Sequence, residues 1–522
     1  MTPSRKLPLG IQTFEELRRK GCLYVDKTDM VWHIANGNKY NYLNRPRRFG
    51  KSLLASTLHS YFDGRRDLFE GLKIMEMETD WVSRPVFHFD MSSISSADGF
   101  LSYLNRKLSE YEEVYGIVEA EGRASDRFAG IIRRSYQKTE QEVAIIIDEY
   151  DSPVRNTLTT ADHDATRAHY RDFLSILKSE GSYIHCVFIT GISKFTQLSL
   201  FSALNTLRNL SFESRYASLC GITNEEIESC LGTEMDVMAK AMGMTYEQLR
   251  QRLREYYDGY HFTDDLIDVY NPTSLFTALD DKKIRNYRAS DGATLLLPTI
   301  LSENNIEIEK MDHVVVSRTE LETSDYLLSK PAVSLYQMGY LTIKDYDEWN
   351  YILGFSNAEV RQTMSDIVLP NVMPELSSSL RVSALGRMAA AMDSGDVDSA
   401  MQYISQLVAA APYDNQRHKV LESHFQFLLS MMFYSVNFSV QQEVRVAAGR
   451  IDMVVTTRRW LYVIELKLKS NGGVLAAMEQ MQARRYVDAY SAQYRQLCQL
   501  AIEFDDDTHC VNRWIHSGFQ MG

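Results

Sequence analysis

Short runs that are apolar throughout, separated by stretches with helical spacing, fill residues 20–215. Three of these runs are "RPVFHFDMS", "EVAIIIDEYD" and "IHCVFITGIS". A strand that is apolar on both faces has to be covered on both faces, and parallel strands joined by helices provide that cover. We therefore predict an α/β domain built around a parallel sheet in this part of the chain.

The second of these runs ends in three carboxylates within four positions, at Asp148, Glu149 and Asp151. A buried strand that opens into a hydrated loop would explain them. A strand that carries acids to a metal ion and a water molecule would explain them as well. The sequence around residue 50 favours the second interpretation.

Residues 45–54, "RPRRFGKSLL", lie between a strand-like run and a helix. Gly50, Lys51 and Ser52 match the end of the phosphate-binding loop GxxxxGK[ST] (Walker A), although Arg45 occupies the place of its first glycine. In such a loop, backbone N–H groups and the start of the helix hold phosphates, the lysine reaches the terminal phosphates, and the serine hydroxyl binds Mg²⁺. The predicted cofactors are ATP and Mg²⁺.

The acidic run and the loop support each other. P-loop ATPases end a second buried strand in Asp-Glu (Walker B), where the Asp holds Mg²⁺ and the Glu activates water. Asp148 and Glu149 fit these two roles, and all three carboxylates are then best explained by metal and water. Thr190, at the end of the third run, either senses the γ-phosphate or satisfies its own turn. Arg208 is either a trans-acting finger or a surface arginine.

A second α/β domain is predicted to begin at residue 413. The pattern is a helix, "HKVLESHFQFLLSMMF", three strands, a helix, "GVLAAMEQMQARRYVDAY", and a strand, "RQLCQLAIEF". The strands before the second helix are "FSVQQEVRV", "RIDMVVTT" and "LYVIELKL".

Acidic and basic side chains in these strands form a second candidate site. Alternation along a strand places Glu465 and Lys467 on one face, and pairing of the strands as a hairpin would bring Asp452 close to Glu465. A divalent ion, Mg²⁺ or Mn²⁺, would compensate the acids and bind a scissile phosphate, while the lysine orients or deprotonates water. Glu422 is the candidate third acid, and Gln480 is a candidate supporting residue.

The pattern D…ExK after a helix is that of PD-(D/E)XK nucleases, although an amphipathic hairpin with surface charges would produce it too. Basic neighbours are candidates for contacts with a nucleic-acid backbone. They are Arg445, Arg450, Arg458, Arg459, Lys469, Arg484 and Arg485. Solvated charge explains Arg458 and Arg459 equally well, because both lie in the predicted hairpin turn.

We predict four regions: a P-loop domain at 1–218, a mainly helical, lid or winged-helix-like region at 219–345, a connector with a hairpin and helices at 346–412, and the nuclease-like domain at 413–522. Within the helical region, Thr223 and Glu226 have the spacing of a capping box.

Charge is uneven along the chain. The net charge is -13, but residues 411–522 hold 12 basic and 11 acidic side chains, so a polyanion can approach this part. The six cysteines form no CxxC pair, and we find no apolar run of membrane-spanning length and no signal peptide. A cytoplasmic protein with no membrane partner is expected.

Many motifs resemble those of a known family, the predicted AAA-ATPase-like proteins with a C-terminal PD-(D/E)XK nuclease-like domain, found in bacteria such as Bacteroidetes. The matching stretches are "YVDKT", "RPRRFGKSLL", "IIIDEYDSPV", "FITGISKF", "FSALNTLRNLS", "YYDGYHF", "VYNP", "LYQMGYLTI", "GFSNAEVR", "GRIDMVV", "VIELK" and "AMEQMQARRY". The resemblance implies an AAA+-like sheet, a helical lid and a restriction-endonuclease-like domain. It also implies that Arg45 is a family trait.

The leading hypothesis is an ATPase coupled to a metal-dependent nuclease that hydrolyses nucleic acid, DNA in preference to RNA, in defence or mobile-element biology. The first alternative is an ATP-switched nucleic-acid-binding or signalling scaffold whose nuclease-like domain does not cleave. The second is an ATPase that acts on a protein partner. A homo-oligomer is compatible with each of these.

Overall fold

The computed structural model describes residues 5–118, 121–193, 207–288, 311–323, 331–411, 422–446, 449–490 and 496–520. The chain divides into two compact units, one made of residues 1–287 and 311–356 and the other of residues 288–310 and 357–522. Each unit is described by itself. Among the described residues, no helix has both the length and the apolar content that crossing a membrane requires.

The first unit is built on a parallel five-stranded sheet with the order β2-β3-β4-β1-β5. Its strands are β1 (Tyr40–Asn44), β2 (Val86–Asp90), β3 (Val143–Asp148), β4 (Ile184–Gly191) and β5 (Arg208–Asn209). All six residues of β3 are buried, as expected for a strand covered on both faces. The predicted parallel sheet is confirmed.

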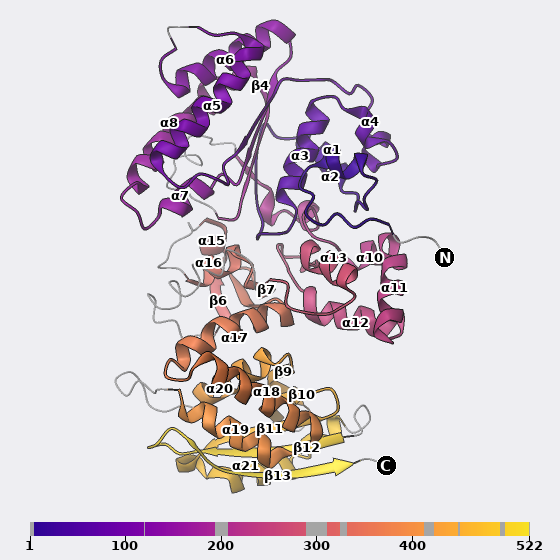
Figure 1. The fold of residues 1–522 in the computed structure, drawn as a ribbon, viewed down its shortest axis with the longest axis vertical. Coiled ribbons are helices and arrows are strands. Elements are labelled where there is room, and N and C mark those ends of the chain that lie inside the picture. The colour runs from indigo at the N-terminus through magenta and orange to yellow at the C-terminus, as the bar shows by residue number, and fades with distance from the viewer. Residues whose placement is uncertain are drawn as a thin grey trace. The chain divides into compact units, whose positions relative to one another are not determined.

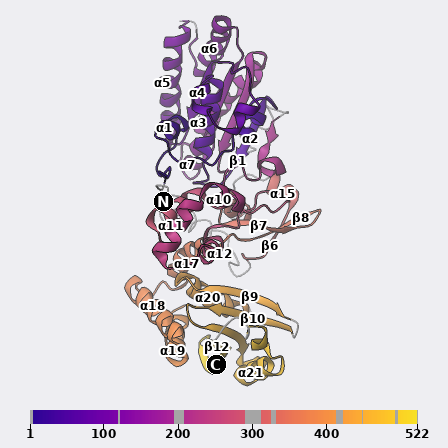
Figure 2. The ribbon, with the colours of Figure 1, turned by 90° about the vertical axis from the view of Figure 1, so that its right-hand side faces the viewer.

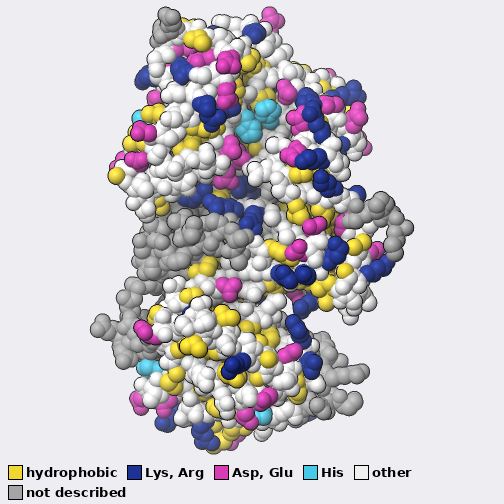
Figure 3. All heavy atoms as spheres, viewed as in Figure 1, with side chains coloured by type: hydrophobic (Ala, Val, Ile, Leu, Met, Phe, Trp, Pro, Cys, Tyr) yellow, Lys and Arg dark blue, Asp and Glu magenta, His cyan; other side chains and the backbone are white. Residues whose placement is uncertain are grey.

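Helices cover the two faces of this sheet (Figure 1). One side carries α5 (Ala97–Tyr115), α6 (Ala124–Thr139) and α8 (His163–Ser179), with α7 (Ser152–Thr157) directly after β3. The other side carries α1 (Phe14–Arg19), α2 (Thr28–Ala35), α3 (Lys51–Phe62) and α4 (Arg66–Phe69). Acidic and basic side chains intermingle on the face of the molecule shown in Figure 3.

The rest of the first unit is mainly helical, with a small sheet. Its helices are α10 (Asn224–Cys230), α11 (Gly232–Met242), α12 (Tyr246–Tyr257), α13 (Pro272–Asp281), α15 (Arg318–Thr323) and α16 (Pro331–Gln337). The antiparallel sheet has the order β6-β8-β7, with β6 (Val314–Ser317), β7 (Leu341–Tyr346) and β8 (Asn350–Phe355). The hairpin β7–β8 therefore begins within the range that the sequence predicted to be helical.

The second unit contains a five-stranded mixed sheet with the order β13-β12-β11-β10-β9 (Figures 1 and 2). Its strands are β9 (Ser439–Val446), β10 (Gly449–Thr456), β11 (Leu461–Leu468), β12 (Gln496–Phe504) and β13 (Val511–Gln520). Its helices are α17 (Ala358–Val372), α18 (Ser378–Ser394), α19 (Val397–Ala409), α20 (Glu422–Ser435) and α21 (Gly473–Ala483).

One feature of this unit differs from the sequence prediction. Strand β13 was missed, because "VNRWIHSGFQ" lacks a clear apolar alternation, and it pairs with β12 along its length. The first unit ends at Ser356, inside the predicted connector at 346–412. Ser377 caps α18 by accepting a hydrogen bond from the backbone N–H of Leu380.

Candidate functional site

The loop between β1 and α3 has the backbone shape of a phosphate-binding loop. Gly50 precedes the helix with φ of 89°, a left-handed conformation that glycine adopts without steric cost. Helix α3 begins at Lys51, so the N–H groups of its first turn face the loop. An anion placed there would meet these donors and the positive end of the helix dipole.

Lys51 and Glu149 meet at this loop, although 97 residues lie between them in the sequence. The Lys51 side chain is 4% exposed, and its Nζ lies 3.3 Å from Glu149 Oε1. It also donates to the backbone oxygen of Pro46 at 3.2 Å. The two predicted groups thus share one buried point between α3 and the end of β3.

The neighbouring carboxylates of Asp148 and Glu149 have different protonation behaviour. Burial raises the pKa of Asp148 to about 6, although the Ser52 hydroxyl, which donates to it, acts in the opposite direction. Burial also acts to raise the pKa of Glu149, but the positive charges of Lys51 and Arg155 outweigh it and hold that pKa below its usual value. Glu149 is therefore ionised at neutral pH, as a general base must be.

Thr190 lies at the end of β4, the strand that separates β1 from β3. Its position is level with Leu43, directly before the loop. The Thr190 hydroxyl is fully buried, and among the described residues it has no hydrogen-bond partner. A buried hydroxyl without a partner is costly, so it fits a site that a phosphate oxygen or a water molecule would complete.

Asp151 corrects the interpretation that all three carboxylates serve metal and water. Its side chain is fully buried and accepts hydrogen bonds from the backbone N–H groups of Ile192 and Ser193, at 3.2 and 3.1 Å. It also forms an ion pair with Arg155. Asp151 therefore ties the turn after β3 to the turn after β4, which is a structural role.

Arg45 has a structural role too, because it is 1% exposed and points away from the phosphate loop. Its guanidinium donates to the backbone oxygens of Ser211 and Tyr216, both at 3.0 Å. It also lies 4.2 Å from the ring centroid of Phe262. The residue that replaces the expected glycine thus anchors the loop to the "YYDGYHF" segment.

Phe49 belongs to the loop, whereas Arg208 of β5 lies level with Asn41, near the start of β1. Phe49 packs edge-on against Tyr260 and Phe262, with ring centroids 4.9 and 5.5 Å apart. Arg208 pairs with Glu213 of the same chain at 2.6 Å, and its side chain is 34% exposed. Six residues predicted to contact the nucleotide lie in this loop or next to it: Gly50, Lys51, Ser52, Asp148, Glu149 and Thr190.

A largely apolar cavity of about 90 Å³ lies beside this loop. It is lined by Gly50 and Leu53 on one side, by Tyr24 on another, and by Pro272 and Phe276 of α13. Lys27 also lines it and forms a buried ion pair with Glu226 at 2.5 Å. The motifs "YVDKT" and "VYNP", which sequence reasoning left without a role, thus meet at the cavity.

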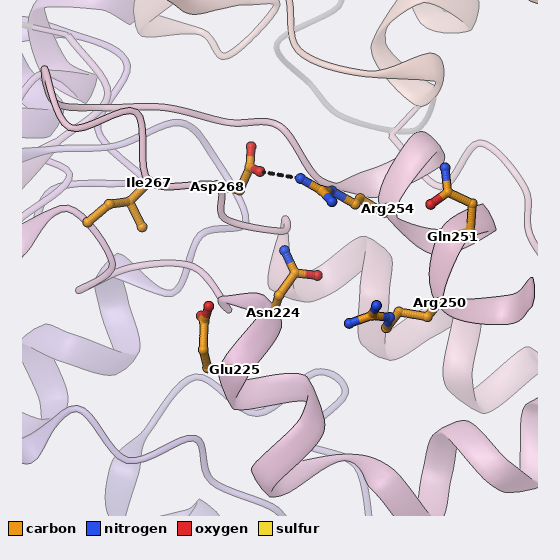
Figure 4. Close-up of a pocket in the computed structure, with 7 residues that line it drawn as sticks. All are labelled: Asn224, Glu225, Arg250, Gln251, Arg254, Ile267 and Asp268. Carbon is orange, nitrogen blue, oxygen red and sulfur yellow. Dashed lines mark hydrogen bonds and ion pairs between the residues drawn. The ribbon is translucent and has the colours of Figure 1, made fainter. Parts of the chain in front are cut away.

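A polar pocket of about 400 Å³ between α10 and α12 was also missed by sequence reasoning (Figure 4). Arg254 pairs there with Asp268 at 3.0 Å, and Arg250 pairs with Glu228 at 2.6 Å. Because these arginines have acidic partners within the chain, the pocket offers no excess charge to a ligand. We assign it no function.

The second candidate site lies on neighbouring strands of the second unit. Strands β10 and β11 pair antiparallel with Met453 opposite Ile464, and one further pair in this register places Asp452 opposite Glu465. Asp452 Oδ2 accepts a hydrogen bond from the backbone N–H of Leu466 at 2.9 Å. The hairpin that the sequence predicted is confirmed, and it brings the two carboxylates together.

Glu465 is the most perturbed group of this site. Burial, followed by the charge of Asp452, raises its pKa to about 8, and burial also raises the pKa of Asp452. The Gln480 side chain donates to Glu465 Oε1, whereas Glu465 Oε2 is buried without a hydrogen-bond partner among the described residues. Such an orphaned acidic oxygen is the group that a cation would satisfy.

Lys467 lies between two acids. Its Nζ is 3.9 Å from Glu465 Oε1 and 3.6 Å from Glu422 Oε2. Glu422 Oε1 accepts hydrogen bonds from the backbone N–H of Leu468, at 3.1 Å, and from the Asn471 side chain, at 3.2 Å. The predicted residues therefore gather in one place, with Glu422 on the far side of the lysine.

A divalent cation fits this donor set in part. Within the ranges that the structure describes, no three His, Cys, Asp or Glu side chains converge as a ready-made metal site. Asp452 and Glu465 would be the two protein ligands, and water and phosphate oxygens would fill the other positions, as is usual for Mg²⁺. The role of Glu422 as a third ligand stays a prediction.

Comparisons with known proteins agree with the predicted two-domain architecture. Residues 8–201 match the family model described as predicted AAA-ATPase, and residues 420–514 match that of the PD-(D/E)XK nuclease superfamily. An uncharacterized protein encoded in the vnfD 5' region of Azotobacter chroococcum mcd 1 is 28% identical over 519 residues, 97% of this chain and 98% of that protein.

A structural match was found to a signal transduction ATPase with numerous domains from Pyrococcus horikoshii that has a tetratricopeptide repeat sensor. The two chains are 12% identical, and the match covers 79% of this chain and 54% of that chain. The TM-score is 0.28, which does not establish a shared fold. This chain thus spans about half the length of that solved structure.

The fold and the two sites define a P-loop ATPase-like protein that also carries a nuclease-like domain. More particularly, the chain combines a predicted AAA-ATPase domain at 8–201 with a PD-(D/E)XK nuclease superfamily domain at 420–514.

Proposed function

We propose that the protein binds and hydrolyses ATP in its first unit, and that this activity controls a metal-dependent nuclease in its second unit. DNA is the substrate that we propose first. The observation that carries the proposal is the convergence of Asp452, Glu465 and Lys467 on two adjacent strands, in a chain that also pairs a P-loop lysine with an acid after a buried strand.

In the ATPase site, each residue has a distinct task. Bound Mg²⁺ would be held by Ser52 and Asp148, and it neutralises phosphate charge. Lys51 would leave Glu149 for the terminal phosphates, which would free the Glu149 carboxylate to accept a proton from the attacking water. Thr190 would donate its hydroxyl to that water or to the γ-phosphate.

The cavity beside Gly50 suits the base of the nucleotide. A planar heterocycle prefers apolar and aromatic walls, which Tyr24, Pro272 and Phe276 supply. Lys27 adds a hydrogen-bond donor at the edge of the cavity. A base held there would contact both the P-loop side and the helical region, so these parts would respond together to ATP.

In the nuclease site, Asp452 and Glu465 would hold Mg²⁺ or Mn²⁺, which activates water and polarises the scissile phosphate. Gln480 fixes the Glu465 carboxylate by donating to one of its oxygens. Because burial raises the pKa of Glu465 to about 8, this carboxyl group would have to release a proton for a cation to bind. Lys467 orients the water or accepts its proton.

The cellular setting is also proposed. A cytoplasmic location agrees with the free cysteines. Defence or mobile-element biology is a context in which a nuclease gated by ATP would be useful, and homo-oligomerisation is compatible with the fold.

A nucleic-acid-binding or signalling scaffold, switched by ATP, is the second candidate. The observation that favours it is the engagement of Glu422 by Leu468, Asn471 and Lys467, which leaves two carboxylates for a cation. Such a protein would bind nucleic acid without cleaving it.

Cleavage of labelled linear, circular and single-stranded DNA and RNA tests the proposal, with Mg²⁺ or Mn²⁺ and with or without ATP. We expect Asp452→Ala and Glu465→Ala to lower the cleavage rate by about 100-fold or more, the size of effect that follows loss of one transition-state contact. Lys51→Ala should abolish ATP turnover and alter cleavage.

Two exposed positions provide matched controls, Lys73→Ala for the lysine and Asp488→Ala for the acids, since their side chains are 57% and 52% exposed. Failure of the wild type to cut any of these substrates while it turns over ATP would refute the nuclease proposal and leave the scaffold.

A further inference from the structure

We propose that Arg445, Arg450 and Arg484 form a binding strip for the phosphodiester backbone of a nucleic acid, beside the carboxylates of the second unit. This inference rests on the proposed function, because it deals with the substrate of the same site. It selects three of seven basic residues that the sequence left equivalent.

The first observation is a pair of like charges on adjacent strands. Arg445 of β9 lies directly opposite Arg450 of β10, and both side chains are exposed. Like charges that face each other across an antiparallel pair repel and disfavour the sheet. Glu443 offsets part of the repulsion through its 2.6 Å ion pair with Arg450.

The second observation is the distance of these arginines from the acids. Arg450 lies two residues before Asp452 on β10, about 7 Å along the strand. Arg445 lies level with Arg450, because the two are paired. Strand β9 is the edge of the sheet, so the arginines lead from that edge to the carboxylates.

The third observation is the position of Arg484. This residue follows α21 by one position and lies one helical turn after Gln480, the residue that donates to Glu465. Its Nη1 donates to the Tyr486 hydroxyl at 3.1 Å, and that hydroxyl donates to the backbone oxygen of Arg450 at 2.8 Å. Arg484 is thereby held at the backbone of the first residues of β10.

Gly449 makes room for this guanidinium. A Cβ at residue 449 would lie 2.4 Å from Arg484 Nη1, and the φ of Gly449 is 146°, a conformation that other residues rarely adopt. Within the described ranges, Arg484 has no carboxylate partner. The strip therefore holds three guanidinium groups and one nearby acid, Glu443.

The other four basic residues are placed differently. Arg458 and Arg459 lie in the turn between β10 and β11, at the opposite end of the strands from Arg450. Lys469 pairs with Asp505 at 3.0 Å, and Arg485 pairs with Asp488 at 2.7 Å. They carry no part of the proposed strip.

A nucleic acid fits this arrangement because its phosphates repeat along a chain. With one phosphate at Asp452 and Glu465, the neighbouring phosphates reach Arg450 and Arg484, and then Arg445 at the edge of the sheet. Guanidinium groups suit this task, since their fork of N–H donors matches phosphate oxygens. The strip carries no base contact, so it holds the backbone without reading sequence.

Salt-dependent binding tests the strip. Full-length protein carrying Asp452→Ala, which prevents cleavage, is titrated into labelled single-stranded and duplex DNA between 50 and 200 mM salt. The slope of log K against log[salt] is negative, and each removed phosphate contact reduces its magnitude by about 0.7 for single strands and 0.9 for duplexes. We expect that change for Arg445→Ala, Arg450→Ala and Arg484→Ala, and retention of the slope for Arg484→Lys.

The double variant Arg458→Ala/Arg459→Ala is the matched control and should keep the slope of the parent. An equal loss in this control, an unchanged slope in the three strip variants, or no binding to either DNA at low salt would overturn the strip. Circular dichroism confirms that each variant is folded.

Failure of the strip and failure of the nuclease proposal are distinguishable. Loss of binding in the strip variants, in a protein whose wild type cuts no substrate, supports the strip and refutes the nuclease. Cleavage by the wild type together with unchanged salt slopes in the strip variants supports the nuclease and overturns the strip.

Discussion

Carboxylates at the end of β3 are held by different groups, although they are near neighbours in the sequence. Asp148 lies with the Ser52 hydroxyl, Glu149 with Lys51, and Asp151 with two backbone N–H groups and Arg155. The sequence shows only that the acids are close together. Only the folded chain brings near the partners from α3 and from the turn after β4, whereas Arg155 lies four residues after Asp151.

Substitution of Asp151 tests its structural role. Asp151→Ala removes the nearest acidic partner of the buried Arg155 and leaves two backbone N–H groups without an acceptor, so the free energy of unfolding should fall by about 3–5 kcal/mol. Urea unfolding measures it. Asp164→Ala, at a side chain that is 97% exposed, is the control and should change stability little. Equal stabilities of the two variants would contradict the assignment.

The raised pKa of Asp258, in the segment "YYDGYHF", predicts that the stability of the protein depends on pH. Burial, then the charge of Asp268, raises its pKa in the folded protein to about 7, from the ordinary value of 3.8. Between these values the folded chain binds more protons than the unfolded chain, so the contribution of this group to stability falls as pH rises through that window.

Asp258→Asn removes this titration. The variant should therefore gain stability relative to the wild type as pH rises from 5 to 8, which urea unfolding at several pH values measures. Asp164→Asn provides the exposed control. A stability difference that stays constant with pH would show that Asp258 is not held protonated in the folded protein.

At the scale of elements, the local rules of helix and strand formation were sufficient for several elements, although not for β13. The buried strand β3, the helix after the P-loop and the hairpin β10–β11 all lie where the sequence predicts them. The capping box of α10 is confirmed, because the Thr223 hydroxyl accepts from the Glu226 N–H and the Glu226 carboxylate accepts from the Thr223 N–H. These features depend on neighbours within a few residues.

Thr223→Ala should lower the free energy of unfolding by about 1 kcal/mol, the usual cost of losing an N-cap side chain. Thermal or urea unfolding measures this change. Thr159→Ala, at an exposed threonine in a turn, is the control and should be nearly neutral. A neutral Thr223→Ala would mean that the Lys27–Glu226 ion pair alone fixes the start of α10.

At the scale of the whole molecule, the two sites lie in different compact units, with the ATPase residues in the first and the nuclease residues in the second. Control of one by the other would therefore be an energetic coupling between distinct sites. Such coupling is reciprocal for binding, because each ligand must change the affinity of the other by the same factor.

We expect nucleic acid to change the Kd for ATP by the factor by which ATP changes the Kd for nucleic acid, about 5-fold or more. The Asp452→Ala protein allows both measurements without cleavage, and a non-hydrolysable ATP analogue keeps the system at equilibrium. Lys51→Ala is the control in which the factor should be one. A factor of one in the parent would show that the two sites act independently.

The sequence by itself determined the parallel sheet and the position of the loop before α3, because each depends on a local pattern: burial of a strand on both faces, and a glycine before a helix. Tertiary structure alone decided that Arg45 and Asp151 are structural and that β4 lies between β1 and β3. Those outcomes depend on partners distant in sequence, which a local pattern does not reach.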